Sequence, residues 1–520
     1  MEIRRKQIIL LLYVPVVIFL LWLPEQIQMK GLGFFSAALS SVLGPMLLLF
    51  GSLSGAVERL QRPRIAKGQY KNADRILKSA LVYALSAGGL LTGLTYLVCS
   101  LWMEKVLLVP YGVLALRFFA PVILLFALAA VFKGYFQGQG NGLPTVCFEA
   151  LSIVFGIVFA ILFGARLTAY GQKAAALLAN SDFTAMYGAA GTVLGFALGY
   201  FIGLVFLFVV YLISEKNRRR KAAAGMKKTE GYKDAFRLLF LSVLPYVPVG
   251  LLAVLPFPVG ILLFQRAREN IYESVQAYGA FVENYVLWVI LALLPILAGS
   301  CGMVGRSCLH IRREEYRHGK EAVQRMTQWL ICLSAFVAAV YMVFGGEISD
   351  AGLCSGGLCV IFLAVGICFL QVLWDCGKLK EVYASMGCGC GLALIVLAVG
   401  MKSAADPVVV LSCGLIAQGF GTLLVACVLL LRLYRFSLNG VRCVAFPVLS
   451  AAVSGLVMLL LKKLLLDGVG AGACSWICAV IGFMVHLVLI LVLRCCRKSD
   501  LKDMPGGKLL LLFGKLIHFM

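Results

Sequence analysis

The chain has 520 residues, of which 62% are hydrophobic and 14% are charged, and its mean hydropathy is +0.96. A soluble protein of this length cannot hide so much apolar surface, because part of its outside must stay polar. The net charge of +23 suggests a nucleic-acid partner, but the charges lie in the short segments between apolar runs, which argues against one. The composition predicts an all-α polytopic membrane protein.

In chain order, fourteen apolar runs are long enough to cross a bilayer, for which a helix needs roughly 20 residues. The runs are continuous rather than alternating, which predicts helices and not the strands of a barrel. They cover 8–28, 33–56, 76–102, 112–133, 144–165, 187–213, 236–263, 275–302, 324–345, 352–374, 382–401, 407–432, 443–466 and 472–494.

Charge predicts how these helices are oriented. The first run follows Arg4-Arg5-Lys6 and has no small-residue cleavage site after it, so we expect a retained first helix with a cytoplasmic N-terminus. Most Lys and Arg then lie in cytoplasmic loops, notably 59–78, 216–237, 306–325 and 494–508. This positive-inside distribution predicts a multi-pass protein of a cell membrane with both termini in the cytoplasm.

The two halves of the chain repeat each other at a spacing of roughly 245 residues, a period that matches transporter repeats. A span with Pro45 and Gly51-Ser52 leads into a basic loop, and a span with Pro295 and Gly299-Ser300 does the same. Because matching spans have the same orientation, we expect two parallel six-helix lobes, 1–220 and 221–435. Residues 436–520 would add helices 13 and 14 and a cytoplasmic tail.

Prolines interrupt corresponding helices of the two halves. Pro15 lies in the first span, and the seventh contains Pro245, Pro248, Pro256 and Pro258. Proline lacks the amide hydrogen of a helix and clashes with the preceding turn. Interrupted helices at matching places predict site-lining or moving elements, and the alternative is a simple kink.

A Gly-rich segment follows the fourth run and is expected to form a short polar hairpin at the membrane surface. It runs Lys133-Gly134-Tyr135-Phe136-Gln137-Gly138-Gln139-Gly140-Asn141-Gly142-Leu143-Pro144-Thr145. Its glycines permit tight turning and close backbone approach. The chain has no G-x-x-x-x-G-K-[ST] motif, so a nucleotide site is not expected.

This segment and residues 64–73 resemble motifs of the multidrug/oligosaccharidyl-lipid/polysaccharide (MOP) exporter superfamily. Within it, the chain resembles polysaccharide biosynthesis proteins of the stage V sporulation protein B type. The resemblance implies a MATE-like fold that flips undecaprenyl-linked sugars across a bacterial membrane by alternating access. Lipid II flippases would hold arginines in helices 1, 2 and 8, whereas helix 8 here carries Glu283.

A flippase needs cations for a phosphate-bearing headgroup, and arginine suits phosphate through paired hydrogen bonds. The candidate substrate-binding residues are Gln265, Arg266, Arg268, Arg117, Glu283, Asn284 and Tyr278. The alternative for the arginines is a solvated loop or snorkelling to the surface. Glu283 is also a candidate for coupling to an ion, Na⁺ or H⁺, because a charge within a span needs a partner or water.

Other polar residues have simpler explanations. His486 is expected to be a satisfied membrane histidine, Lys462 and Lys463 to snorkel or contact lipid, and Glu149 to favour a helix N-terminus. The 18 cysteines include no C-x-x-C pair, so no metal site is expected.

Three functions remain open. The first is a flippase for a lipid-linked oligosaccharide or cell-wall precursor, with membrane lipid around it. The second is a cation-coupled exporter of small amphipathic compounds. The third is a scaffold that transports nothing and recruits envelope-synthesis enzymes to its basic loops. No catalytic dyad or triad is present, so an enzyme is not expected, and no cofactor is expected beyond a coupling ion.

Overall fold

The computed structural model describes residues 14–224, 230–267, 271–297, 301–348, 356–403, 406–465, 471–493 and 495. Within these ranges the chain is helical and contains no β-strand, as the composition predicts. Two compact units follow each other along the chain, one within residues 8–283 and the other within residues 284–520.

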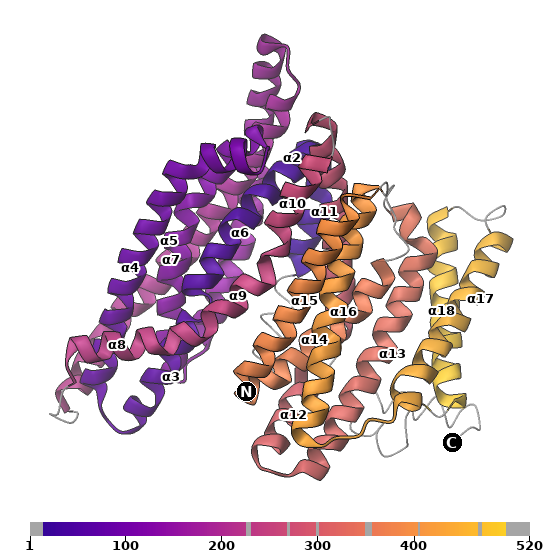
Figure 1. Ribbon diagram of the computed structural model, residues 1–520. Helices are drawn as coiled ribbons and strands as arrows, with labels where there is room; N and C mark the ends of the chain where they lie inside the picture. The colour runs from indigo at the N-terminus through magenta and orange to yellow at the C-terminus, as the bar shows by residue number, and fades with distance from the viewer. Residues whose placement is uncertain are drawn as a thin grey trace. The chain divides into compact units, whose positions relative to one another are not determined.

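The first unit begins with a long apolar helix and ends in α11, which crosses the boundary between the units (Figure 1). Its elements are α2 (Val14–Phe50), α3 (Leu53–Ala66), α4 (Tyr70–Ser100), η1 (Leu101–Val106), η2 (Pro110–Gly112), α5 (Val113–Gly138), α6 (Leu143–Leu178), α7 (Asp182–Ala224), α8 (Tyr232–Val243), η3 (Leu244–Tyr246), α9 (Val247–Val254), α10 (Pro256–Ala267) and α11 (Ile271–Pro295).

The second unit contains the remaining helices. They are α12 (Cys301–Arg312), α13 (Tyr316–Ile348), α14 (Gly356–Asp375), α15 (Leu379–Gly400), α16 (Pro407–Tyr434), η5 (Val441–Ala445), α17 (Phe446–Leu465) and α18 (Ala471–Val492).

Thirteen helical stretches of the described chain are long and apolar enough to cross a membrane, against fourteen predicted. The difference lies in α2, where the first two expected spans form one helical stretch. A break remains at Gln28, which has a φ of +66° and a ψ of 162°. A non-glycine residue rarely adopts positive φ, so Gln28 marks the junction that the sequence placed between residues 28 and 33.

The seventh expected span is broken at its prolines. Pro245 lies in the 3-10 turn η3 between α8 and α9, and Pro256 is the first residue of α10. Figure 1 shows α8 running crosswise to α4. Pro248 lies in the first turn of α9, where its missing amide hydrogen costs nothing, and Pro258 lies in the first turn of α10.

The break positions α8, α9 and α10 against the N-terminal helices. α8 packs on α3 and α4, and α9 packs on α2, where a Cβ on Gly250 would touch the backbone of Leu47. The compact unit therefore extends to Glu283, whereas the repeat places a lobe boundary at residue 220. The division into lobes by internal repeat stays a prediction.

Two later helices attach to α13 through polar contacts. His486 of α18 is 1% exposed, with its Nδ1 2.6 Å from Ser450 Oγ and its Nε2 3.0 Å from the Cys332 carbonyl oxygen. This confirms the expectation of a satisfied membrane histidine. Lys462 of α17 donates to the Val343 carbonyl oxygen at 3.1 Å, so its ammonium is held by α13.

Candidate functional site

The junction in α2 lies between two other helices of the first unit. On one side, a Cβ on Gly31 would touch the Ala185 carbonyl of α7, and Ile27 packs against Gly188 of the same helix. On the other side, Gly33 leaves space for the backbone of Val275 in α11. At Gly33 the Val275 backbone approaches too closely for a side chain, and at Gly31 the contact is tight.

An ion pair fixes the same segment to α7. Lys30 Nζ lies 2.8 Å from Asp182 Oδ1, and the Asp182 side chain is only 5% exposed. The Asn180 side chain accepts a hydrogen bond from the Asp182 amide at 2.9 Å and donates to the Tyr111 hydroxyl at 2.8 Å. A buried carboxylate needs such a cationic partner, because desolvation otherwise disfavours its charge.

Predicted site residues lie on the α10 and α11 side of this junction. Gln265 is 2% exposed and accepts a hydrogen bond from Ser274, which joins the end of α10 to the start of α11. Tyr278 is 3% exposed and packs between the rings of Phe264 and Phe281. The two polar side chains are therefore both buried near the α2 junction.

The remaining predicted residues are more dispersed. Glu283 is partly exposed and the neighbouring Asn284 is buried, one on each side of the boundary between the units. Arg266 is exposed in the last turn of α10, while Arg268 lies outside the described residues.

Arg117 lies against α4 instead. Its Nε donates to Cys99 Sγ at 3.3 Å, and its guanidinium lies 5.9 Å from the centre of the Tyr96 ring. Tyr96 and Leu97 are large side chains that are 55% and 79% exposed on this face. These surroundings favour the snorkelling interpretation of Arg117.

The Gly-rich segment is more helical than predicted. The expectation of a hairpin from residue 133 was wrong for Lys133 to Gly138, which form the last turns of α5, so only 139–142 lie between helices. Gly134 and Gly138 are one turn apart and face α3, where a Cβ would meet Ser54 and Gln61. The glycines serve helix packing here, which explains why a turn-forming composition continues a helix.

Charged and polar residues of this segment connect α5 with α6. Lys133 Nζ lies 2.5 Å from Glu149 Oε1, and the Glu149 side chain is 8% exposed. Pro144 lies in the first turn of α6, and Thr145 is 1% exposed. The partner of Glu149 is thus a lysine of the same motif, whereas the sequence analysis expected Glu149 only to stabilise the N-terminus of a helix.

Tyr135 and Gln137 lie in the final turns of α5, where Tyr135 packs against the rings of neighbouring aromatic residues.

A third ion pair lies near α8. Arg64 of α3 binds Glu230 through Nε and Nη2, with Nη2–Oε2 at 2.9 Å, and the Glu230 amide donates to Asn72 Oδ1 at 2.9 Å. Arg59 lies 4.5 Å from the ring centre of Tyr246 in η3. These contacts hold the broken helix on α3 and α4.

Comparison with known proteins agrees with this architecture. No protein-family model matches the chain. Stage V sporulation protein B of Bacillus subtilis (strain 168) is 21% identical over 494 residues, which cover 92% of this chain and 91% of that protein.

Solved structures match over most of the chain. The inward-facing conformation of a multidrug resistance MATE family transporter of the MOP superfamily has a TM-score of 0.60 at 14% identity, covering 81% of this chain and 96% of its own. The lipid II flippase MurJ, in an inward closed conformation, has a TM-score of 0.58 at 13% identity, covering 89% of this chain and 96% of its own. The chain has the fold of the MOP-superfamily transporters.

Besides Lys133–Glu149, the sequence analysis missed two further ion pairs of this fold. Lys30 and Asp182 each lie in a segment between expected apolar runs, and 152 residues separate them. Arg64 and Glu230 are 166 residues apart, and nothing in the local sequence pairs them. One signal was present for Lys30, since it is a single cation in a short segment between two apolar runs.

Proposed function

We propose that the chain is a membrane transporter that flips a lipid-linked oligosaccharide or a cell-envelope polysaccharide precursor by alternating access. The observation that supports this most is the shared fold, which extends over 96% of both a MATE transporter and the lipid II flippase MurJ. The relative named as a stage V sporulation protein, similar over nearly its full length, is a bacterial protein, which agrees with a bacterial transporter. The proposed activity is transport.

Coverage favours a lipid-linked substrate over a drug. The MurJ match extends over 89% of this chain, against 81% for the MATE transporter. The cation-coupled multidrug exporter remains the second candidate, because the MATE structure has the slightly higher TM-score. Recruitment of envelope-synthesis enzymes to the basic loops is the alternative that needs no transport.

The proposed substrate contacts are cations and polar groups at the end of α10 and the start of α11. Arg266 is exposed there, and Gln265 and Ser274 join the two helices behind it. A guanidinium presents a planar pair of donors to a diphosphate. Glu283 is the proposed group for coupling to Na⁺ or H⁺, and the prolines of α8 to α10, with Pro15, are the proposed hinges.

A flipping assay tests this proposal. The full chain is reconstituted in liposomes with a fluorescent undecaprenyl-diphosphate sugar, and the lipid that crosses the bilayer is measured. We expect Arg266→Ala, Arg268→Ala and Glu283→Ala each to slow flipping about 10-fold or more, because each removes a charge-assisted contact. Arg317→Ala, an exposed arginine of α13, should leave the rate unchanged.

Two outcomes would overturn the proposal. If the wild-type chain moves no lipid-linked sugar but exports a cationic dye along an Na⁺ or H⁺ gradient, the multidrug alternative holds. If it moves neither, the scaffold alternative holds. If all three variants flip lipid at the wild-type rate, the proposed substrate contacts are wrong, whereas the proposed transport activity stands.

A further inference from the structure

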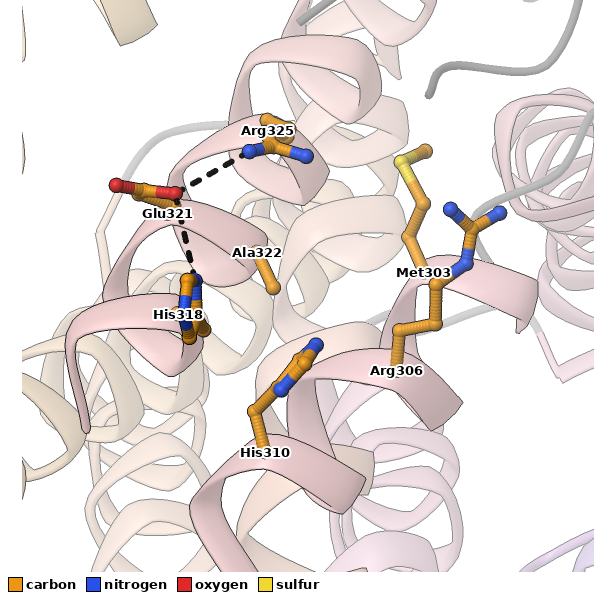
Figure 2. A pocket seen from close by; sticks show the side chains of 7 residues that line it. All are labelled: Met303, Arg306, His310, His318, Glu321, Ala322 and Arg325. Carbon is orange, nitrogen blue, oxygen red and sulfur yellow. Dashed lines mark hydrogen bonds and ion pairs between the residues drawn. The ribbon is translucent and has the colours of Figure 1, made fainter. Parts of the chain in front are cut away.

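A basic cavity lies between α12 and α13 of the second unit, outside the site described above. α12 contributes Met303, Arg306 and His310, which are spaced by three and four residues and so share one helix face. α13 contributes His318, Glu321 and Arg325 at the same spacing. Figure 2 shows the two faces opposite each other, with the arginine and histidine side chains around the gap.

The charged groups of the cavity are partly paired with each other. Glu321 Oε2 lies 3.3 Å from Arg325 Nη2 and 3.9 Å from His318 Nδ1. His310 Nδ1 lies 2.6 Å from Glu315 Oε2, and the two imidazole rings have centres 5.7 Å apart. The lining therefore contains one carboxylate, two guanidinium groups and two imidazoles, and the carboxylate contacts Arg325 and His318.

Size and exposure limit what the cavity can hold. Its volume is about 260 Å³, below the roughly 300–1,000 Å³ of pockets for drug-sized ligands. Arg306 and Glu321 are exposed, so the cavity is open to solvent. A small anionic group fits these properties, whereas an oligosaccharide is too large.

We propose that this cavity is a binding site for a phosphate group, distinct from the proposed transport path. Arg306 from α12 and Arg325 from α13 would each donate hydrogen bonds to phosphate oxygens, which suits the planar guanidinium. The Glu321 carboxylate pairs with Arg325 in the structure, so the ligand displaces this carboxylate. Bound phosphate then joins α12 to α13. The inference does not depend on the transported substrate.

The bound phosphate has two possible sources with one chemistry, a free anion in solution or the headgroup of an anionic lipid. The positive charge predicts that this end of the second unit faces the cytoplasm, where the inner leaflet carries anionic lipid. Titration of the purified full chain with inorganic phosphate and with pyrophosphate tests the first source. Nanodiscs of phosphatidylcholine with or without phosphatidic acid test the second.

Substitutions distinguish specific binding in the cavity from nonspecific attraction of anions to positive charge on the surface. We expect Arg306→Gln and Arg325→Gln to weaken binding about 10-fold or more, because each loses a charge-assisted hydrogen bond. Arg317→Gln removes the same charge from an exposed position of α13 that does not line the cavity, and it should leave the affinity unchanged. Glu321→Gln removes the competing carboxylate and should strengthen binding several-fold.

The titrations with soluble phosphates and with lipid nanodiscs distinguish the two sources of the phosphate group. Binding of free phosphate or pyrophosphate supports a soluble anion, and a response to phosphatidic acid alone supports a lipid headgroup. The proposal is overturned if neither probe binds the folded wild-type chain. It is also overturned if Arg317→Gln weakens binding as much as Arg306→Gln, or if Glu321→Gln weakens it. A variant that misfolds can only lose affinity for phosphate. The expected gain in affinity of Glu321→Gln therefore tests the proposal even if an arginine variant fails to fold.

Discussion

At the scale of the residue, Cys376 is a partly exposed cysteine whose thiol has a lowered pKa. It follows α14 directly and is partly exposed. A hydrogen bond with the Cys308 thiol lowers the pKa of Cys376 to about 7, a hydrogen bond with Tyr434 acts in the same direction, and burial opposes both. The hydrogen bond with Cys376 and burial raise the pKa of Cys308. Because the thiolate is the reactive form, we expect Cys376 to react rapidly with a maleimide near neutral pH.

The pH dependence of Cys376 labelling, in the wild type and in a Cys308→Ala variant, tests this expectation. Maleimide labelling of Cys376, followed by peptide mass spectrometry, should rise with a midpoint near pH 7, since the thiolate forms as pH increases through its pKa. Cys308→Ala removes the donor, so the midpoint should move to higher pH. An unchanged midpoint would show that Cys308 does not stabilise the thiolate.

Single residues also show what the sequence could and could not predict. His486 was predictable because one histidine in an apolar helix must have partners, and the structure supplies Ser450 and the Cys332 carbonyl. The Lys30–Asp182 pair was not, because 152 residues separate its members and only the folded chain brings them together. The substrate-binding role of Arg266 stays a prediction.

At the scale of the element, glycines bring α6 and α7 into direct backbone contact. Five glycines of α7 are spaced by three or four residues, a pattern typical of close helix packing, and all five face α6; they are Gly188, Gly191, Gly195, Gly199 and Gly203. A Cβ on Gly195 would overlap the backbone of Ala160, and one on Gly199 would overlap that of Gly156. Helices in a bilayer associate largely through such close packing, because lipid offers no hydrophobic drive between them.

Gly199→Ala should therefore destabilise the protein. The added methyl group forces the two backbones apart, which costs about 1–3 kcal/mol for an overpacked contact. Gly93→Ala in α4 is the control, because a Cβ there meets open space and alanine is the better helix former. Thermal unfolding in detergent should show a lower Tm for Gly199→Ala only. Equal Tm values for the two variants would contradict a tight α6–α7 contact.

Element boundaries were the weaker part of the sequence prediction. Apolar runs located the spans, because the length of a bilayer-crossing helix is set by membrane thickness. They could not locate the end of α5, since Gly134 and Gly138 signal a turn locally but pack against α3 in the fold. The broken seventh helix was predictable, because Pro245 and Pro256 act through the backbone itself.

At the scale of the whole molecule, the distribution of positive charge predicts the orientation in the membrane. Arg313 lies in the turn between α12 and α13, which is predicted to be cytoplasmic, and Lys402 follows α15 on the predicted outer side. Both residues are exposed. We expect a membrane-impermeant maleimide to label Lys402→Cys in intact cells and Arg313→Cys only after lysis, because basic loops are retained in the cytoplasm.

Native Cys376 serves as an internal control in the same measurement, since its turn is also predicted to be cytoplasmic and peptide mass spectrometry reads each site separately. It should label with Arg313→Cys, after lysis. Labelling of Arg313→Cys in intact cells would invert the orientation and move the cavity between α12 and α13 to the outer face. The cavity would then face extracellular anions rather than the anionic lipids of the inner leaflet, so a lipid headgroup would no longer be the expected ligand. The two arginines would still favour an anion.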